Sequence, residues 1–560
     1  MKSLKLKKLC AVLMAATIST SLFIGCGSDD KSTGTSGSGS AATSGQDLMF
    51  NLGEDPETID PTLNTSSGAG TIIVNAFEGL MLLDESEQPT YGAAENMEVS
   101  EDGLVYTFKL RQDGKWSDGE PVTANDFKYS WMRALDKATA AEYSYQLYYI
   151  KNAEKFYNGE VSADEVGIKV VDDYTLEVTL ESPTSYFPQL LAFPTYAPLR
   201  EDIVSANPEG WATSPETYIC NGPFKLVKWD MKDQLVFERN ENYWDASNVK
   251  LDSLTFKLVT DETTAYSELK AGNFDMVNSV PTNEIQPGKE EGLVKISPYL
   301  GTYFFAINVG KQDTLNDDVK KALSNKLVRQ ALNLAVDRQE IIDNVAKAEQ
   351  VPAYSFVPKG IFNEDGSEFA DKEYYDPTAM DENIAKAKEL LKEAGVDNLK
   401  LKLAYSTHKS QQEKIALVLQ SNLKDVGIEL ELKPMEKSAF YGELWSGADA
   451  TFDLAINGYV MGSEPAEYAS VFTSNGSDNL SGYSNKEVDK KFAEALKETD
   501  DAKRDALYKE IQKIIVEDVA LYPISYPKSI VAIDKNYDVK EANLVPIFMF
   551  RDLNGIKVKN

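Results

Sequence analysis

Residues 399–432 read LKLKLAYSTHKSQQEKIALVLQSNLKDVGIELEL. Apolar and polar residues alternate at both ends, and this two-residue period predicts strands at 399–405 and 428–432. Between them, residues 411–426 are apolar at four-residue intervals from Ile415 onward, and a glycine follows, as at the end of a helix. A helix that connects two strands in this way places them in parallel. The segment therefore predicts a βαβ unit within an α/β protein.

The same periodicities extend outward from this unit. The chain has 560 residues, of which 42% are hydrophobic, so its length predicts two or three lobes. Turns are predicted at Asp113-Gly114 and at Ser117-Asp118-Gly119, with a positive φ at both glycines. The other predicted elements are a strand that begins at Leu48, helices at 71–83, 381–394, 486–499 and 501–518, a helix capped by Thr123, and strands at 105–110 and 174–180.

The N-terminus has the order of a secretion signal. Four lysines among the first eight residues precede an apolar run at 9–25. The run ends in Phe23-Ile24-Gly25-Cys26, which resembles a bacterial lipobox, although phenylalanine stands where that pattern usually has leucine. The resemblance implies that residues 1–25 are removed and that Cys26 is lipidated; an uncleaved anchor and an ordinary signal peptide are the alternatives. Residues 26–45, rich in Ser, Gly and Thr, are predicted to form a flexible tether.

Charge and rare residues exclude several classes of function. The formal net charge is −32, which excludes nucleic acid and anionic lipid head groups as partners because both attract fields of Lys and Arg. Cys10 leaves with the signal and Cys26 is predicted to be lipidated, so Cys220 has no partner for an internal disulfide. His408 is the only histidine, which excludes a multi-histidine metal site. No Gly-x-Ser-x-Gly, Walker-type or dinucleotide-binding motif is present, so we predict no catalytic residue, no metal and no cofactor.

Four motifs follow one another along the mature chain. They are YTFKLRQDGKWSDGEPVTANDFKYSW (106–131), NGPFKLVKWDMKDQLVFERNENYW (221–244), VRQALNLAVDRQEII (328–342) and GYSNKEVD (482–489). In this order they resemble the extracytoplasmic solute-binding family of peptide and nickel ABC importers, typified by oligopeptide-binding lipoproteins. Most of these motif residues are predicted to be scaffold, with Trp116 and Trp131 as core anchors.

The resemblance implies a two-lobed, periplasmic-binding-protein-like (type II) α/β fold with a hinge and an additional inserted subdomain. Ligand would lie in the cleft, and the lobes would close over it. The implied boundaries are residues 46–76, 198–298 and 549–560 for the first lobe, 77–197 for the inserted subdomain and 299–548 for the second lobe.

The resemblance also implies an exported substrate-binding lipoprotein that is not an enzyme. Such a protein captures a small solute at the extracytoplasmic face of the cell membrane and delivers it to an ABC permease, which works with ATPase subunits. It is expected to be a monomer. Its N-terminal lipid is expected to anchor it to the membrane. An oligopeptide is the expected cargo, and an oligosaccharide or another non-peptide solute is the alternative.

Peptide carriers of this type hold an extended peptide by its main chain, as an added strand is held. Alignment by eye from Phe77-Glu78-Gly79-Leu80 matches residues 65–67 to the first loop that contacts the ligand main chain. Tyr143 falls where the family has a cleft aromatic, and residues 301–304 match a strand at the mouth of the second lobe. The ligand-binding residues implied in this way are Thr65, Ser66, Ser67, Tyr143, Gly301, Tyr303, Phe304, Tyr459, Val460, Met461, Gly462 and Glu464.

Residues 451–468, TFDLAINGYVMGSEPAEY, depart from the family at one position. In peptide binders an Asp of this stretch pairs with the α-ammonium of the ligand, and the aligned residue here is Gly462. An ammonium buried without a counter-charge is costly. Three interpretations stay open: Glu464 or another acid reaches the amine, the peptide binds without a clamped amine, or the ligand is a different solute.

Overall fold

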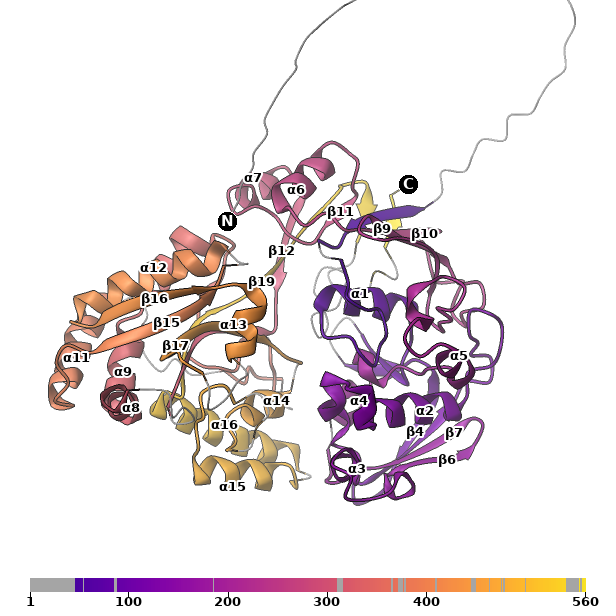
Figure 1. Cartoon of the computed structure of the whole chain (residues 1–560), viewed down its shortest axis with the longest axis horizontal. Coiled ribbons are helices and arrows are strands. Elements are labelled where there is room, and N and C mark those ends of the chain that lie inside the picture. The colour runs from indigo at the N-terminus through magenta and orange to yellow at the C-terminus, as the bar shows by residue number, and fades with distance from the viewer. Residues whose placement is uncertain are drawn as a thin grey trace, which may run out of the picture. The chain divides into compact units, whose positions relative to one another are not determined.

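We describe the protein from a computed structural model, drawn in Figure 1. It describes residues 46–539 together with 553 and 556–559, apart from residues 54, 85–87, 185, 310–315, 364–365, 371–375, 377–378, 408–409, 445–449, 463, 475, 477–478 and 499. Cys26 and His408 therefore lie outside the described residues. Within the described part, no helix combines the length and the apolar character that crossing a membrane requires.

The predicted βαβ unit is present at one edge of a six-stranded sheet with the order β14-β18-β13-β17-β15-β16. β15 (Lys400–Ser406) and β16 (Glu429–Met435) pair in parallel, and α12 (Ser410–Asp425) connects them. Ile415, Leu419 and Leu423 are buried against this sheet together with side chains of α9 and α11. The remaining strands of the sheet are β13 (Gly301–Ile307), β14 (Val351–Pro352), β17 (Leu454–Val460) and β18 (Leu521–Tyr526). The helices of this part are α8 (Asp317–Ser324), α9 (Lys326–Leu334), α10 (Arg338–Glu340), a π-helical segment at Ile341–Ala346, α11 (Met380–Glu393), α13 (Lys437–Leu444), α14 (Pro465–Ser470), α15 (Lys486–Ala495) and α16 (Asp501–Asp518).

A seven-stranded sheet collects strands from three distant parts of the chain, in the order β12-β19-β11-β1-β10-β9-β8. β1 pairs in parallel with β10 and β11, and its residues Leu48 and Phe50 are buried, as the alternating pattern predicts. The strands of this seven-stranded sheet are β1 (Asp47–Asn51), β8 (Phe224–Asp230), β9 (Gln234–Arg239), β10 (Ser253–Lys257), β11 (Met276–Val277), β12 (Val294–Pro298) and β19 (Lys528–Ile533). The helices of this part are α1 (Ser67–Ala76), α5 (Glu201–Ala206), α6 (Glu262–Lys270) and α7 (Ile285–Glu290).

The predicted inserted segment contains its own antiparallel sheet, β4-β5-β7-β6. Its main helix α2 (Ala124–Leu135) begins as predicted at Thr123, which forms a capping box with Asp126. Trp116 and Trp131 are fully buried, so they are core anchors. The strands and helices of this segment are β2 (Met81–Leu83), β3 (Pro89–Tyr91), β4 (Ala94–Val99), β5 (Val105–Leu110), a 3-10 helix at Glu142–Leu147, α3 (Ala153–Tyr157), β6 (Ile168–Asp172), β7 (Thr175–Thr179) and α4 (Phe187–Leu190).

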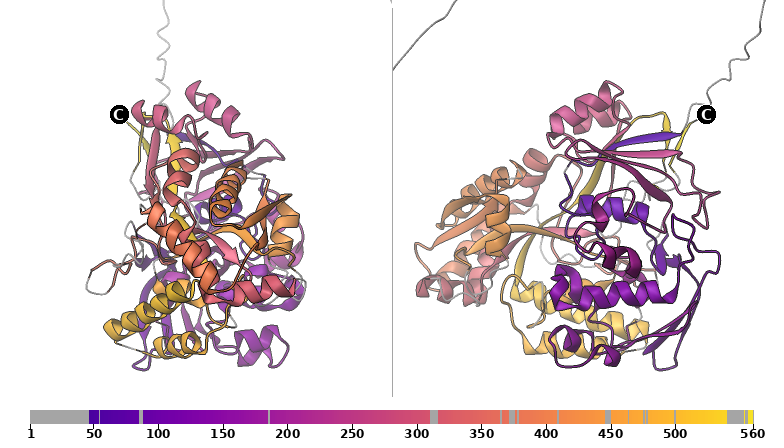
Figure 2. Two further views of the ribbon diagram at one scale, coloured as in Figure 1. Left: turned by 90° about the vertical axis from the view of Figure 1, so that its left-hand side faces the viewer. Right: turned by 45° about the vertical axis from the view of Figure 1, so that its right-hand side comes forward.

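Two adjacent crossings join the two large sheets. β12 runs into β13 through residues 299 and 300, and β18 runs into β19 through Pro527. β12 and β19 pair along their length, so the crossings lie side by side, as Figures 1 and 2 show. The predicted end of the second lobe at 548 is wrong, because β19 already belongs to the seven-stranded sheet.

Two local predictions are also wrong. The helix predicted at 71–83 ends at Ala76, and residues 81–83 form β2. Phe77 has an extended backbone and ends the helix, and the chain then passes close to residue 191, where a Cβ on Gly79 would lie 2.6 Å from the carbonyl oxygen of Leu191. Of the two turn glycines, Gly119 has a positive φ of 95° and Gly114 does not, because the reversal occurs at residues 117–119.

Glu78 joins the inserted segment to residues just before β8 and just after β9 of the seven-stranded sheet. Its carboxyl group is buried and accepts hydrogen bonds from the Tyr243 hydroxyl (2.5 Å) and the Trp244 indole (2.8 Å). Its backbone N–H donates to Asn221 Oδ1 at 3.0 Å. Burial raises the pKa of Glu78 to about 7, although both hydrogen bonds and the charge of Arg111 oppose the shift.

This raised pKa predicts a loss of stability as the pH rises. The folded state holds the Glu78 proton up to about pH 7, whereas the unfolded chain releases it near pH 4.5. The stabilisation that the bound proton of Glu78 contributes is therefore complete below pH 4.5 and is lost as the pH rises through 7. The free energy of unfolding should fall by about 2 kcal/mol between pH 5 and pH 7. Urea unfolding at the two pH values should show this fall for the wild type but not for Glu78→Gln. The same fall in Glu78→Gln would contradict the assignment to Glu78.

Candidate functional site

Five of the predicted residues of the second lobe lie on two adjacent antiparallel strands, and Met461, Gly462 and Glu464 follow the second of these strands. β13 and β17 pair so that Gly301 faces Val460 and Tyr303 faces Gly458. Phe304 and Tyr459 point to one face of the sheet, where their ring centroids are 5.2 Å apart. Tyr303 points to the opposite face, near Gln412, and burial raises the pKa of its hydroxyl. The structure therefore brings Phe304 and Tyr459 together and separates both from the Tyr303 ring.

The end of β17 presents main-chain groups at an edge of the sheet. Met461 N–H donates to Leu300 O (3.3 Å), and Asn308 N–H donates to Asp453 O (3.0 Å). Because hydrogen-bonding direction alternates along an antiparallel strand, odd-numbered residues between them bond β13, and Gly458 and Val460 point to the other edge.

On that other edge, β17 pairs with β15 only at Leu454 and Ala455. No strand in the described part of the chain pairs with β17 beyond Ala455 on this side. Gly458 is exposed, and Tyr459 and Val460 are partly exposed, whereas residues 452–457 are buried. The amide and carbonyl groups of Gly458 and Val460 thus form a short exposed edge at which an extended chain can pair.

An acidic side chain that the sequence reasoning missed lies beside this edge. The N–H of Gly462 donates to Glu467 Oε2 at 3.1 Å. Pro465 begins α14, which places Glu467 in the first helical turn, facing back toward residue 462. Burial raises the pKa of the Tyr186 hydroxyl well above its ordinary value, and the nearby Glu467 carboxylate adds to the shift. An acid of the second lobe therefore stands next to the glycine that replaces the expected Asp.

Glu464 has a different partner. Its Oε1 accepts a hydrogen bond from Gln189 Nε2 at 3.1 Å, which connects the residue before α14 to α4 of the inserted segment. Burial raises the pKa of the Glu464 carboxyl group, against the opposing charge of Arg504. Glu464 is thus engaged in a contact between two parts of the fold.

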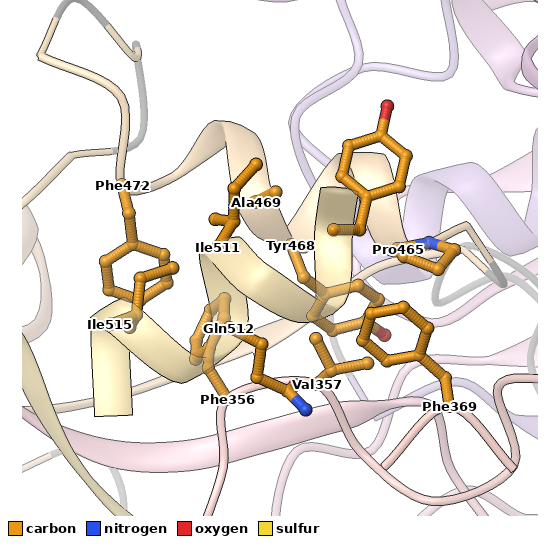
Figure 3. Close-up of a pocket in the computed structure, with 11 residues that line it drawn as sticks. Phe356, Val357, Phe369, Pro465, Tyr468, Ala469, Phe472, Ile511, Gln512 and Ile515 are labelled. Atoms are coloured by element: carbon orange, nitrogen blue, oxygen red, sulfur yellow. The ribbon is translucent and has the colours of Figure 1, made fainter. Parts of the chain in front are cut away.

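An aromatic cluster holds α14 in place. Phe356 contacts the rings of Phe304, Tyr459, Tyr468 and Phe472, with centroid distances between 4.9 and 6.1 Å. Figure 3 shows Phe356, Tyr468 and Phe472 around a small pocket under α14, whose volume is about 10 Å3. Its other labelled lining residues are Val357, Phe369, Pro465, Ala469, Ile511, Gln512 and Ile515. This packing fixes α14 and with it the positions of Glu464 and Glu467.

The predicted residues of the first lobe and the inserted segment form a second group. Ser66 caps α1 by accepting the Ala69 N–H at 3.1 Å, and Thr65 and Ser67 beside it are exposed. The Tyr143 hydroxyl lies 3.5 Å from Thr65 O, and its ring packs edge-on against Phe193. Tyr143 is therefore next to the predicted loop.

The described residues contain no group of three or more His, Cys, Asp and Glu side chains that could hold a metal ion. Cys220 is buried, and burial raises the pKa of its thiol to about 12. Such a thiol stays protonated at neutral pH and makes a poor nucleophile.

Comparison with known proteins places this geometry in a family. The model for bacterial extracellular solute-binding proteins, family 5 Middle, matches residues 88–480. The chain belongs to this family. The predicted family is thereby confirmed, and this solute-binding protein acts outside the cytoplasm.

This family 5 protein is similar to curated relatives over most of its length. It is 32% identical over 537 residues to the oligopeptide-binding protein OppA of Bacillus subtilis. The aligned region covers 93% of this chain and 94% of that protein. It is 31% identical over 494 residues to the probable deoxycholate-binding periplasmic protein YgiS of Escherichia coli, with coverages of 86% and 88%.

A solved structure supports the predicted fold class. Haemophilus influenzae OppA in complex with RPPGFSPFR matches with a TM-score of 0.78 and 29% identity, covering 92% of this chain and 99% of that one. The family 5 protein thus has the predicted α/β, type II periplasmic-binding-protein fold.

Proposed function

We propose that this protein is the lipid-anchored, oligopeptide-binding receptor of an ABC importer. It captures an extended peptide between its lobes and delivers it to the membrane permease, which ATPase subunits drive. It works as a monomer and has no catalytic activity of its own.

The exposed edge at Gly458 and Val460 is the observation that carries this proposal. Main-chain pairing binds a peptide without reading its side chains, which suits a carrier of varied peptides. The names of two relatives give independent support, since OppA of Bacillus subtilis is an oligopeptide-binding protein and Haemophilus influenzae OppA is solved with RPPGFSPFR. The other predicted contacts are Thr65, Ser66, Ser67 and Tyr143 from the first lobe and the inserted segment, and Gly301, Tyr303, Phe304, Tyr459, Met461, Gly462 and Glu464 from the second lobe.

Closure takes place about the two crossings between the large sheets. We place the first lobe at residues 46–76, 198–298 and from 528 onward, the inserted subdomain at 77–197 and the second lobe at 299–527. A peptide that contacts both lobes stabilises the closed arrangement, because those contacts exist together only there.

Calorimetric titration tests the cargo class. A pool of tri- to pentapeptides should bind with micromolar or tighter affinity, whereas deoxycholate and cello-oligosaccharides should give no heat. Binding of either non-peptide solute without binding of peptides would overturn the proposal.

The second candidate function is that of a receptor for a non-peptide solute. The similarity to YgiS, a probable deoxycholate-binding protein, favours this alternative. It also agrees with the loss of the usual Asp at Gly462. The same titration separates the two candidates.

The lipid anchor depends on Cys26. We expect Cys26→Ser to lack diacylglycerol and to keep residues 1–25, because the thiol that accepts the lipid is gone and the signal of a lipobox is cut only after lipidation. Mass spectrometry of the intact wild-type and variant proteins would measure both differences. A Cys26→Ser protein with the same N-terminal residue and the same lipid mass as the wild type would contradict lipidation at Cys26.

We propose that Glu467 takes the part of the missing Asp and pairs with the ligand's α-ammonium. Glu467→Gln should weaken binding of a free-amine peptide about tenfold and leave its N-acetylated form unchanged, because a charge-assisted hydrogen bond contributes about 1.5 kcal/mol or more. Glu464→Gln serves as the matched control, since it removes a neighbouring acid. An equal loss for both peptides, or a larger selective loss in Glu464→Gln, would show that Glu467 does not hold the amine.

A further inference from the structure

A second pocket shares Tyr508 with the small pocket under α14. One wall comes from the inserted subdomain, with Val99 at the end of β4 and Tyr106 on β5. The other wall comes from α15 and α16 of the second lobe, with Leu496 and Tyr508. Its volume is about 180 Å3. A cavity of about 150 Å3 already holds benzene, so this pocket can hold a small organic molecule.

The wall on the inserted subdomain is held rigidly. The Tyr106 hydroxyl donates to Thr184 O at 2.8 Å, and both residues line the pocket. The Tyr106 ring also packs edge-on against Phe187, with centroids 5.2 Å apart. This wall therefore does not need to be ordered by a ligand.

The opposite wall contains a buried hydroxyl group, that of Tyr508, which a ligand could satisfy. Tyr508 is 2% exposed, and its hydroxyl has no hydrogen-bond partner among the described residues. The hydroxyl lies within electrostatic reach of Arg504 and of the Tyr186 hydroxyl, and both of these residues also line the pocket. A buried hydroxyl without a partner is costly, which makes this position suited to a polar group of a ligand.

The charges around the pocket favour a cation. Arg504 forms an ion pair with Asp501 at 2.5 Å, so these two charges offset one another. Glu498 also lines the pocket, and its Oε1 accepts the Asp500 N–H at 3.0 Å. The lining thus carries one carboxylate in excess, next to aromatic faces that attract a cation.

We propose that this pocket binds a small organic cation with an apolar body, such as an arylalkyl ammonium. The apolar body lies between Val99 and Leu496, the ammonium faces Glu498, and the Tyr508 hydroxyl supplies the remaining polar contact. Because the two walls belong to different lobes, such a ligand stabilises the arrangement in which they face each other.

Benzylamine, benzyl alcohol and benzoate, compared by ligand-observed NMR on the full chain without peptide, test the proposal. Benzylamine should bind in the millimolar range, at least tenfold more tightly than the other two. Val99→Trp and Leu496→Trp fill the pocket from opposite walls at positions that are not fully buried, so each should abolish binding. Tyr508→Phe should weaken it about fivefold.

Equal binding of the three probes, or loss of benzylamine binding in only one of the two tryptophan variants, would overturn the proposal. These readings need no peptide, so they stand or fall separately from the proposed function. If peptides do bind in the interlobe cleft, benzylamine should raise their affinity by the same factor by which they raise the affinity for benzylamine.

Discussion

Val460→Pro is expected to weaken peptide binding at least about 100-fold, which corresponds to about 2.7 kcal/mol. Proline removes the N–H that points to the exposed edge, and its ring occupies the space where the peptide carbonyl would lie. That carbonyl then stays unpaired inside the cleft, which costs more than the net value of one hydrogen bond. Titration calorimetry with a tight-binding peptide measures the change.

The fold should tolerate this substitution. The Val460 N–H does not bond β13, and proline is accepted at sheet edges. Val460→Ala is the matched control, because it shortens the side chain but keeps the N–H, and it should bind within about threefold of the wild type. Unchanged peptide affinity in a folded Val460→Pro protein would place the peptide elsewhere.

Phe356→Ala is expected to lower the free energy of unfolding by about 3–5 kcal/mol. Phe356 is 3% exposed and contacts four aromatic rings, so its removal leaves a cavity between the sheet and α14. α14 would lose the packing that holds it in place. Because α14 carries Glu467, the selectivity for free-amine peptides should also fall. Chemical denaturation and paired titrations with free and acetylated peptides measure the two effects.

Phe362→Ala is the control for this prediction. Phe362 is 57% exposed, so its truncation should change the unfolding free energy by less than about 0.5 kcal/mol. Similar losses in the two variants would mean that the cluster around Phe356 is not a packed core.

The periodic elements of this fold are predictable from the sequence. The helix predicted at 411–426 is present as α12 (Ser410–Asp425) with Ile415 inward, and Thr123 caps α2, because these signals are local. The apolar run at 71–83 is ambiguous by its nature, since period alone does not separate a buried helix from a buried strand. The transfer of β19 to the other sheet depends on its pairing with β12, more than 200 residues away, and no local pattern announces such a pairing.

The family resemblance matched residues 301–304 and 458–460 to the candidate site, and the structure places them on the paired strands β13 and β17. Contacts that depend on packing between distant segments could not be predicted. The position of Glu467 had a readable signal, since Pro465 starts a helix and places Glu467 in its first turn. The hydrogen bond from Gln189 to Glu464 joins residues that are 275 positions apart, and no local pattern in the sequence signals it.

Native mass spectrometry of the protein, purified from its source without denaturation, tests the oligopeptide claim most directly. The account predicts a heterogeneous excess mass that acid releases as a mixture of short peptides, and its loss in Val460→Pro. A single non-peptide solute, such as a bile acid or an oligosaccharide, bound in place of peptides would contradict it.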